Sequence, residues 1–242
     1  MLFSSFAHRQ RADEWMDAPD ADPRQVEKSL RFIRRINRLL GYTRATLWHL
    51  ERMTCNMPRG ARVTLVDFAT GSADIPMAIL RWADQRDLDI HIVGVDRHPQ
   101  IARAASAACG FARDRRLEIV QADVLSLPFR DNSFDFALTA MFLHHLSDED
   151  AACVLSEMSR VARRGIIAAD LLRSRRAYTW ITLLTALANP MVRNDARVSV
   201  RQAFAKDEVL ALRAAAGVEY AEYYRHFAHR FVLAGIKPAI AG

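Results

Sequence analysis

The 242-residue sequence has few cysteines and no long apolar run. Cys55, Cys109 and Cys153 lie far apart and form no CxxC or His-paired motif, so neither a disulfide framework nor a zinc site is expected. The longest apolar stretch, residues 178–190, is too short to cross a bilayer and contains threonines. Near the N-terminus the charges follow the apolar residues, unlike the layout of a signal peptide. We therefore expect a cytoplasmic protein with no membrane span.

Lysine is also scarce: the basic residues are almost all arginine, and the lysines are Lys28, Lys206 and Lys237. The net charge of +6 would suit nucleic acid, but no aromatic-basic repeat or base-reading module is present. We therefore do not expect a nucleic-acid partner. Hydrophobic residues make up 51% of the chain, enough for the core of one α/β domain with an added cap.

Hydrophobic periodicity divides the chain into two regions. Residues 24–40 and 43–53 have helical patterns, whereas from residue 61 strand-like and helical segments alternate. This alternation predicts βαβ units and a Rossmann-like, mostly parallel, seven-stranded sheet with helices on both faces. The predicted strands are 62–68, 89–96, 116–123, 133–142, 164–172, 218–227 and 229–237, and the predicted helices between them are 74–86, 99–109, 147–162 and 206–218.

The last two predicted strands are separated only by a turn. Such a short connection predicts an antiparallel hairpin, so the last strand should run against the rest of the sheet. In a sheet of this type ligands collect at the carboxyl ends of the parallel strands.

Each of the first three predicted strands ends near a carboxylate: Asp67, Asp96 and Asp123. They are about one strand–helix unit apart and should therefore meet at one edge of the sheet. Asp96 is placed to accept hydrogen bonds from the vicinal hydroxyls of a ribose.

The loop after the first strand, "VDFATGSADIP", keeps only one glycine. We expect Gly71 to be the position that needs a positive φ, since Ala69 and Ala73 disfavour one. Asp74 is expected to cap the following helix and to compete with a phosphate for its N–H groups. The loop therefore favours a cationic ligand with ribose and adenine but no phosphate, a description that S-adenosylmethionine fits.

Four segments together resemble the class I S-adenosylmethionine-dependent methyltransferases: "VTLVDFATGSADIP", "IVGVDRHP", "IVQADVLSLPFRDNSFDFALTAMFLHHL" and "EMSRVARRGIIAADL". The resemblance covers roughly residues 63–171. It implies that the first loop contacts the methionine part of the cofactor, that Asp96 and Arg97 lie at the ribose, that Asp123 and Val124 bind adenine, and that Ala140 floors the transfer site. The loop residues in this implied cofactor set are Asp67, Ala69, Thr70, Gly71 and Asp74.

His144 follows the fourth predicted strand and Asp170 ends the fifth, so the two side chains should face one pocket. Some small-molecule O-methyltransferases with this LHH and aspartate pattern use both positions, which implies His144 as general base. His145 is interpreted as structural, and no metal is expected.

The helical pattern up to about residue 56 predicts a helical cap over residues 1–56. The rest of the chain, 57–242, is expected to form the methyltransferase domain, with an acceptor-site insertion at about 172–203. The cap and insertion should supply apolar walls for a lipophilic or aromatic acceptor. The candidate wall residues are Phe32, Ile33, Trp48, Tyr178, Trp180 and Leu184.

A looser likeness to a branch associated with polyketide-type and quinone-type compounds favours a phenolic hydroxyl as the methylated group. The alternatives are a ring carbon of a quinone-like acceptor, an RNA or protein substrate, and a non-catalytic binding protein of the same fold. A homodimer is possible.

Overall fold

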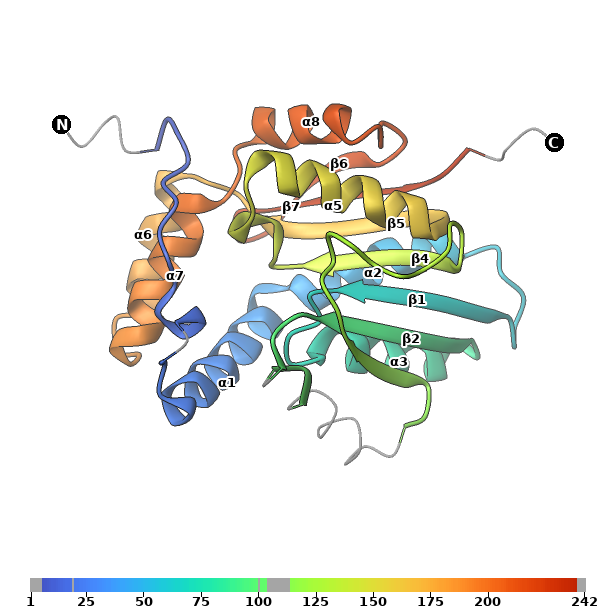
Figure 1. Ribbon diagram of the computed structural model, residues 1–242, viewed down its shortest axis with the longest axis horizontal. Helices are drawn as coiled ribbons and strands as arrows, with labels where there is room; N and C mark the ends of the chain where they lie inside the picture. Colours follow the sequence, from blue (N-terminus) through green and yellow to red (C-terminus); the bar gives the residue numbers. More distant parts are fainter. Residues whose placement is uncertain (1–5, 19, 100, 104–113, 239–242) are drawn as a thin grey trace.

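The structure is a computed structural model that describes residues 6–18, 20–99, 101–103 and 114–238. Its centre is a seven-stranded sheet of order β3-β2-β1-β4-β5-β7-β6 (Figure 1). Strands β1 to β5 are parallel to one another, and β7 is antiparallel to both β5 and β6, which confirms the predicted fold class. The strands are β1 (Arg62–Phe68), β2 (Asp89–Asp96), β3 (Leu117–Gln121), β4 (Phe134–Ala140), β5 (Ala162–Leu171), β6 (Glu222–His226) and β7 (Arg230–Ile236).

Helices cover both faces of the sheet, each over an apolar core. On one face, α2 (Tyr42–Thr54) packs against β5 and β7, and α3 (Asp74–Arg86) packs against β2. On the other face, α5 (Asp148–Val161) packs against β4, β5 and α8 (Lys206–Ala215). The bounds of β1, α3 and β2 agree with the sequence prediction residue for residue.

The helix predicted over residues 99–109 is only partly described. Residues 99 and 101–103 are helical, and the remainder of the predicted helix lies outside the described residues.

A second group of helices lies beyond the carboxyl ends of the parallel strands (Figure 1). It consists of η1 (Trp15–Asp17), α1 (Pro23–Leu40), α6 (Arg175–Leu184) and α7 (Pro190–Gln202), which we call the cap. α7 contacts η1, α1 and α6. Thus α1 belongs to the cap, whereas α2 packs on the sheet.

Local signals explain where the cap helices begin. The Ser174 side chain accepts a hydrogen bond from the Ala177 N–H and caps α6. Asn189 caps α7 in the same way, followed by Pro190 at the first helical position.

None of the helices that the structure describes has the length and apolar content needed to span a membrane.

Candidate active site

A cavity of about 860 Å³ lies at the carboxyl ends of the parallel strands, beneath the cap. All ten predicted cofactor residues line it, and so does His144; Asp170 lies behind His144 and is fully buried. The sheet edge therefore brings together side chains that the sequence distributes over more than seventy positions. The ten residues are Asp67, Ala69, Thr70, Gly71, Asp74, Asp96, Arg97, Asp123, Val124 and Ala140.

Two aspartates hold the loop between β1 and α3 in place. Asp96 accepts hydrogen bonds from the Gly71 N–H at 3.0 Å and the His98 N–H at 2.9 Å. Asp67 accepts one from the Thr70 hydroxyl at 2.8 Å, and burial raises the pKa of Asp67 to about 8. The same carboxylates that face the cavity thus also fix the loop.

The loop backbone differs from the sequence prediction. Gly71 has a positive φ of 55°, as expected, but Ala69 and Ala73 have φ of 55° and 56°. Both alanines therefore adopt a conformation that alanine disfavours. The Thr70 N–H bonds to the Val95 carbonyl and the Ala73 N–H to the Thr70 carbonyl, and this tight path imposes the left-handed conformation on both alanines.

Asp74 does not cap α3, contrary to the prediction. The N-cap is Ala73, which makes no side-chain cap bond, and Asp74 is the first helical residue. The side chain that caps a helix belongs to the residue before the first helical residue, and Asp74 already lies inside α3. The Asp74 carboxylate accepts a hydrogen bond from the Ser72 hydroxyl at 3.0 Å instead. Its negative charge still lies at the helix N-terminus, where it opposes a bound anion.

His144 and Asp170 form a buried pair between neighbouring strands. His144 lies in η2 (Leu143–His145), directly after β4, and Asp170 lies near the end of β5. Asp170 Oδ1 is 2.7 Å from His144 Nδ1, and Asp170 Oδ2 accepts from the His144 N–H at 3.0 Å. These contacts fix both the ring and the chain that carries it, and they leave Nε2 as the nitrogen that points away from the strand.

Opposing effects act on the His144 pKa. Burial lowers it, but the carboxylates of Asp170 and Glu14 raise it more, so the net pKa is above that of a free histidine. For Asp170, burial raises the pKa, while His144 and the N–H groups of Leu171 and His144 lower it, with a net decrease. The pair therefore favours an ionised Asp170 beside an imidazole of increased basicity.

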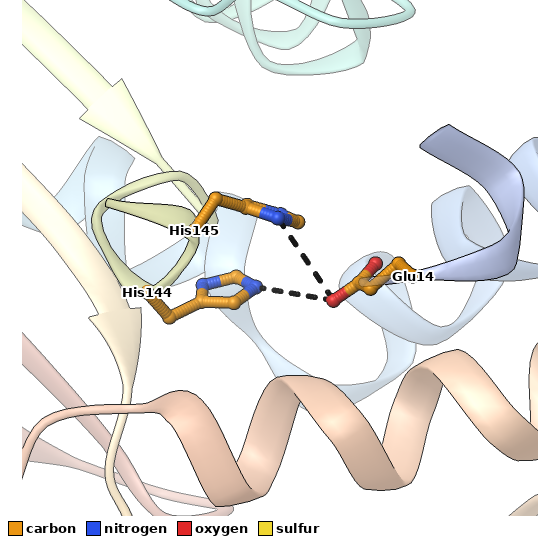
Figure 2. A group of neighbouring side chains, drawn as sticks. All are labelled: Glu14, His144 and His145. Atoms are coloured by element: carbon orange, nitrogen blue, oxygen red, sulfur yellow. Dashed lines mark ion pairs between the residues drawn. The ribbon is translucent and has the colours of Figure 1, made fainter. Parts of the chain in front are cut away.

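Glu14, which the sequence analysis missed, completes a cluster with two histidines. Figure 2 shows its carboxylate facing both rings: Oε1 is 3.9 Å from His144 Nε2 and 4.0 Å from His145 Nδ1. Glu14 is itself buried and accepts from Ser199 Oγ at 2.5 Å and Gln202 Nε2 at 3.2 Å, both from α7. No local motif marks Glu14, because its partners lie far along the chain.

His145 lines the cavity beside His144, with ring centroids 4.2 Å apart. Burial, followed by the neighbouring His144, lowers the pKa of His145 to about 3. This ring is therefore neutral at physiological pH.

The ligand-type atoms of Glu14, His144 and His145 lie within 4.8 Å of one another, a group that could hold a metal ion. An ion about 2.0–2.2 Å from each atom would space tetrahedral ligand atoms by roughly 3.3 Å. The observed 3.9 and 4.0 Å separations would have to shorten for one ion to contact all three. The cluster as it stands is a pair of imidazoles facing a buried carboxylate.

The predicted acceptor walls are only partly correct. Phe32, Trp180 and Leu184 line the cavity. Trp48 does not, because α2 packs on the sheet and directs this ring toward Tyr224 and the Arg52 guanidinium.

Tyr178 does not line the cavity either. It lies on the other side of α6, where its ring contacts Phe6 and its hydroxyl accepts from Arg201. The Ile33 side chain lies outside the described residues.

Comparisons with known proteins agree with this geometry. Residues 66–169 match the methyltransferase domain family. The chain is 38% identical over 106 residues to a demethylmenaquinone methyltransferase of Roseiflexus, covering 44% of this chain and 41% of the relative. It is 27% identical over 130 residues to the Thermus thermophilus protein of that name, covering 54% and 56%. The chain thus spans about half the length of the curated relatives it matches.

Solved structures agree in fold. A methyltransferase of Aquifex aeolicus described as SAM-dependent superposes with a TM-score of 0.62 at 16% identity, over 86% of this chain and 96% of the other. A putative O-methyltransferase of Nostoc punctiforme gives 0.63 at 13% identity, over 96% and 65%. At these identities the likeness establishes the fold alone. Residues 66–169 thus match a methyltransferase domain, and the fold around them is that of methyltransferases described as SAM-dependent.

Proposed function

We propose that the protein transfers a methyl group from S-adenosylmethionine to the phenolic hydroxyl of a small lipophilic acceptor, with His144 as general base. The observation that supports this most strongly is the buried pair in which Asp170 Oδ1 lies 2.7 Å from His144 Nδ1 at the cavity wall. A proton on Nδ1 that is held by a carboxylate leaves the lone pair of Nε2 available to accept another.

The cofactor-side residues have separate roles in this proposal. Asp96 and Arg97 contact the ribose, Asp123 and Val124 the adenine, and the loop residues of the predicted set the methionine part. Each of these residues lines the cavity, and Asp96 already fixes the Gly71 backbone. When bound, S-adenosylmethionine supplies the methyl group as a sulfonium.

The catalytic step requires alignment and removal of one proton. His144 Nε2 takes the proton of the phenol while the oxygen attacks the methyl carbon, and the C–S bond would break so that the sulfur leaves as a neutral thioether. Asp170 keeps the ring in the required tautomer and stabilises the imidazolium that forms. The raised pKa of His144 makes it a stronger base than a free histidine.

The acceptor would occupy the part of the cavity beneath the cap. Phe32, Trp180 and Leu184 provide apolar surface there, which suits an aromatic compound. In this proposal the cap helices within residues 1–56 and 172–203 shape the acceptor side, and the remainder of 57–242 forms the methyltransferase domain, on whose sheet α2 packs.

A ring carbon of a quinone-type acceptor is the second candidate, favoured by the relatives named demethylmenaquinone methyltransferase. Incubation with ¹³C-methyl S-adenosylmethionine and a panel of phenols, quinols and amines separates the two. NMR of the product should show a methyl bonded to oxygen. A methyl bonded to carbon would establish the second candidate, and no transfer to any lipophilic phenol or quinol would refute both.

A further inference from the structure

Large apolar side chains are exposed on and just after α6 and in the turn between β6 and β7. Trp180 and Leu183 are 60% and 65% exposed, Leu184 is also exposed, and Leu187 after the end of α6 is fully exposed. Phe227, in the turn between β6 and β7, is 82% exposed. We call these five side chains the apolar rim.

Part of the apolar rim belongs to the cavity wall. Trp180, Leu184 and Phe227 line the cavity and are exposed at the same time, so the outer surface and the cavity wall are continuous. The side of α6 that faces the cavity is apolar too, since Ala177 and Ile181 line it and Ala177 is buried. A helix that is apolar on both sides needs a partner for its outer face.

Positive charge accompanies the apolar rim. Arg176 is exposed and lies four residues before Trp180, on the same side of α6. Arg193 is exposed in the first turn of α7, shortly after Leu187. Exposed tryptophan and leucine flanked by arginine are the composition of a surface that lies in the interface of an anionic bilayer.

We infer that the apolar rim docks the protein on an anionic membrane surface, so that a lipophilic acceptor enters the cavity from the bilayer. The lipophilic acceptor is taken from the proposed function. Charge favours lipid over a second copy of the chain, because two facing rims would bring Arg176 and Arg193 against like charges on molecules of net charge +6. Anionic headgroups would instead neutralise them.

Vesicle binding of the full chain tests this inference directly. The probe is phosphatidylcholine vesicles with or without about one third phosphatidylglycerol, compared by flotation at low and high salt. We expect binding to the anionic vesicles that weakens with salt. The double variant Leu183→Asp and Leu187→Asp should bind about tenfold to a hundredfold more weakly, since neither charged side chain can enter the acyl region.

The control is Ile236→Asp, because Ile236 is also an exposed large apolar residue but lies at the opposite end of the sheet. It should bind vesicles like the original protein. A second pair, Arg176→Ala and Arg193→Ala, should weaken binding about tenfold on anionic vesicles and leave binding to neutral ones unchanged. Circular dichroism confirms that each variant is folded.

Three results would overturn the inference. The first is no binding of the original protein to anionic vesicles, and the second is an equal loss in the Ile236→Asp control. The third is a dimer, seen by light scattering, that the Leu183 and Leu187 substitutions dissociate. The vesicle assay needs no turnover, so its failure is distinct from a failure of the methyl-transfer proposal, which is measured with a water-soluble phenol.

Discussion

The cofactor side of the cavity and the cap differ in how their contacts are distributed along the chain. On the cofactor side, Asp67 bonds to Thr70 three residues away, and Asp96 bonds to His98 two residues away. In the cap, Glu14 bonds to Ser199, 185 residues away, and just before α6 Arg173 donates to the backbone carbonyls of residues 6 and 7. Asp96 also accepts from the Gly71 N–H, 25 residues away, so the cofactor side is built within neighbouring strand–loop units, whereas the cap depends on contacts between the two ends of the chain. Substitutions should therefore have separable effects on cofactor binding and on acceptor turnover.

The largest of these effects is expected for Asp170→Asn. An amide cannot stabilise the His144 imidazolium, and it can favour the wrong tautomer, so kcat should fall about 10²–10³-fold. Cofactor affinity by calorimetry should stay within about threefold, because Asp170 does not line the cavity. Equal losses in affinity and turnover would show that the two sides are not separable. Circular dichroism checks the fold, since Asp170 is fully buried.

The converse change is Asp96→Ala. The Asp96 carboxylate holds the loop and faces the cavity. Its loss should weaken S-adenosylmethionine binding about 10–100-fold, the effect expected when one or two hydrogen bonds to a charged group are lost. At saturating cofactor, kcat should change little. Glu118→Ala, on the neighbouring strand β3 and outside the cavity lining, is a matched control that should bind normally.

Glu14→Gln should affect the pH dependence of turnover. Glu14 raises the pKa of His144, so its neutralisation lowers that pKa and moves the rising limb of the kcat profile to lower pH. We expect about a tenfold or smaller change in kcat itself. A purely structural role for Glu14 would reduce activity without moving the limb.

The same raised pKa links His144 to stability. A folded-state pKa above the unfolded value contributes stability that is fully present below the unfolded pKa, about 6.5, and is lost as pH rises through the folded pKa. Denaturant titrations should therefore show a His144-dependent contribution that declines above neutral pH. Glu14→Gln should make this decline smaller.

The smallest effect concerns the loop alanines. Ala69 has a positive φ and is half-buried, so Ala69→Gly should relieve strain and stabilise the protein by about 0.5–1 kcal/mol after the entropy of the unfolded glycine is included. Ala73→Gly should give almost no gain, because the Ala73 methyl is fully buried and its loss costs about 0.8 kcal/mol. Urea unfolding measures both. Destabilisation by Ala69→Gly would contradict the observed backbone path.

The sequence predicted the cofactor side of the cavity better than it predicted the cap. Alternating patterns placed β1, α3 and β2 without error, because each depends on residues within the element. The position of His144 near Asp170 followed from strand order alone. Glu14 could not be found this way, since nothing local indicates that residue 14 meets residue 144.

The errors have physical causes as well. Trp48 and Tyr178 are large aromatic residues of the kind that line an acceptor site, but neither faces the cavity. The orientation of α2 and α6 about their own axes decides which side chains face it. Hydrophobic periodicity does not predict that orientation when both sides of a helix are apolar. The left-handed Ala69 and Ala73 were missed because tertiary hydrogen bonds override residue preference.

The most direct test of the central claim is single-turnover methyl transfer to a phenol by the original protein and by His144→Ala, with cofactor binding measured in parallel. We predict O-methylated product from the original protein, and from the variant a rate lower by about 10²–10⁴-fold with cofactor affinity retained. An unchanged rate in His144→Ala, with the same product, would contradict the account.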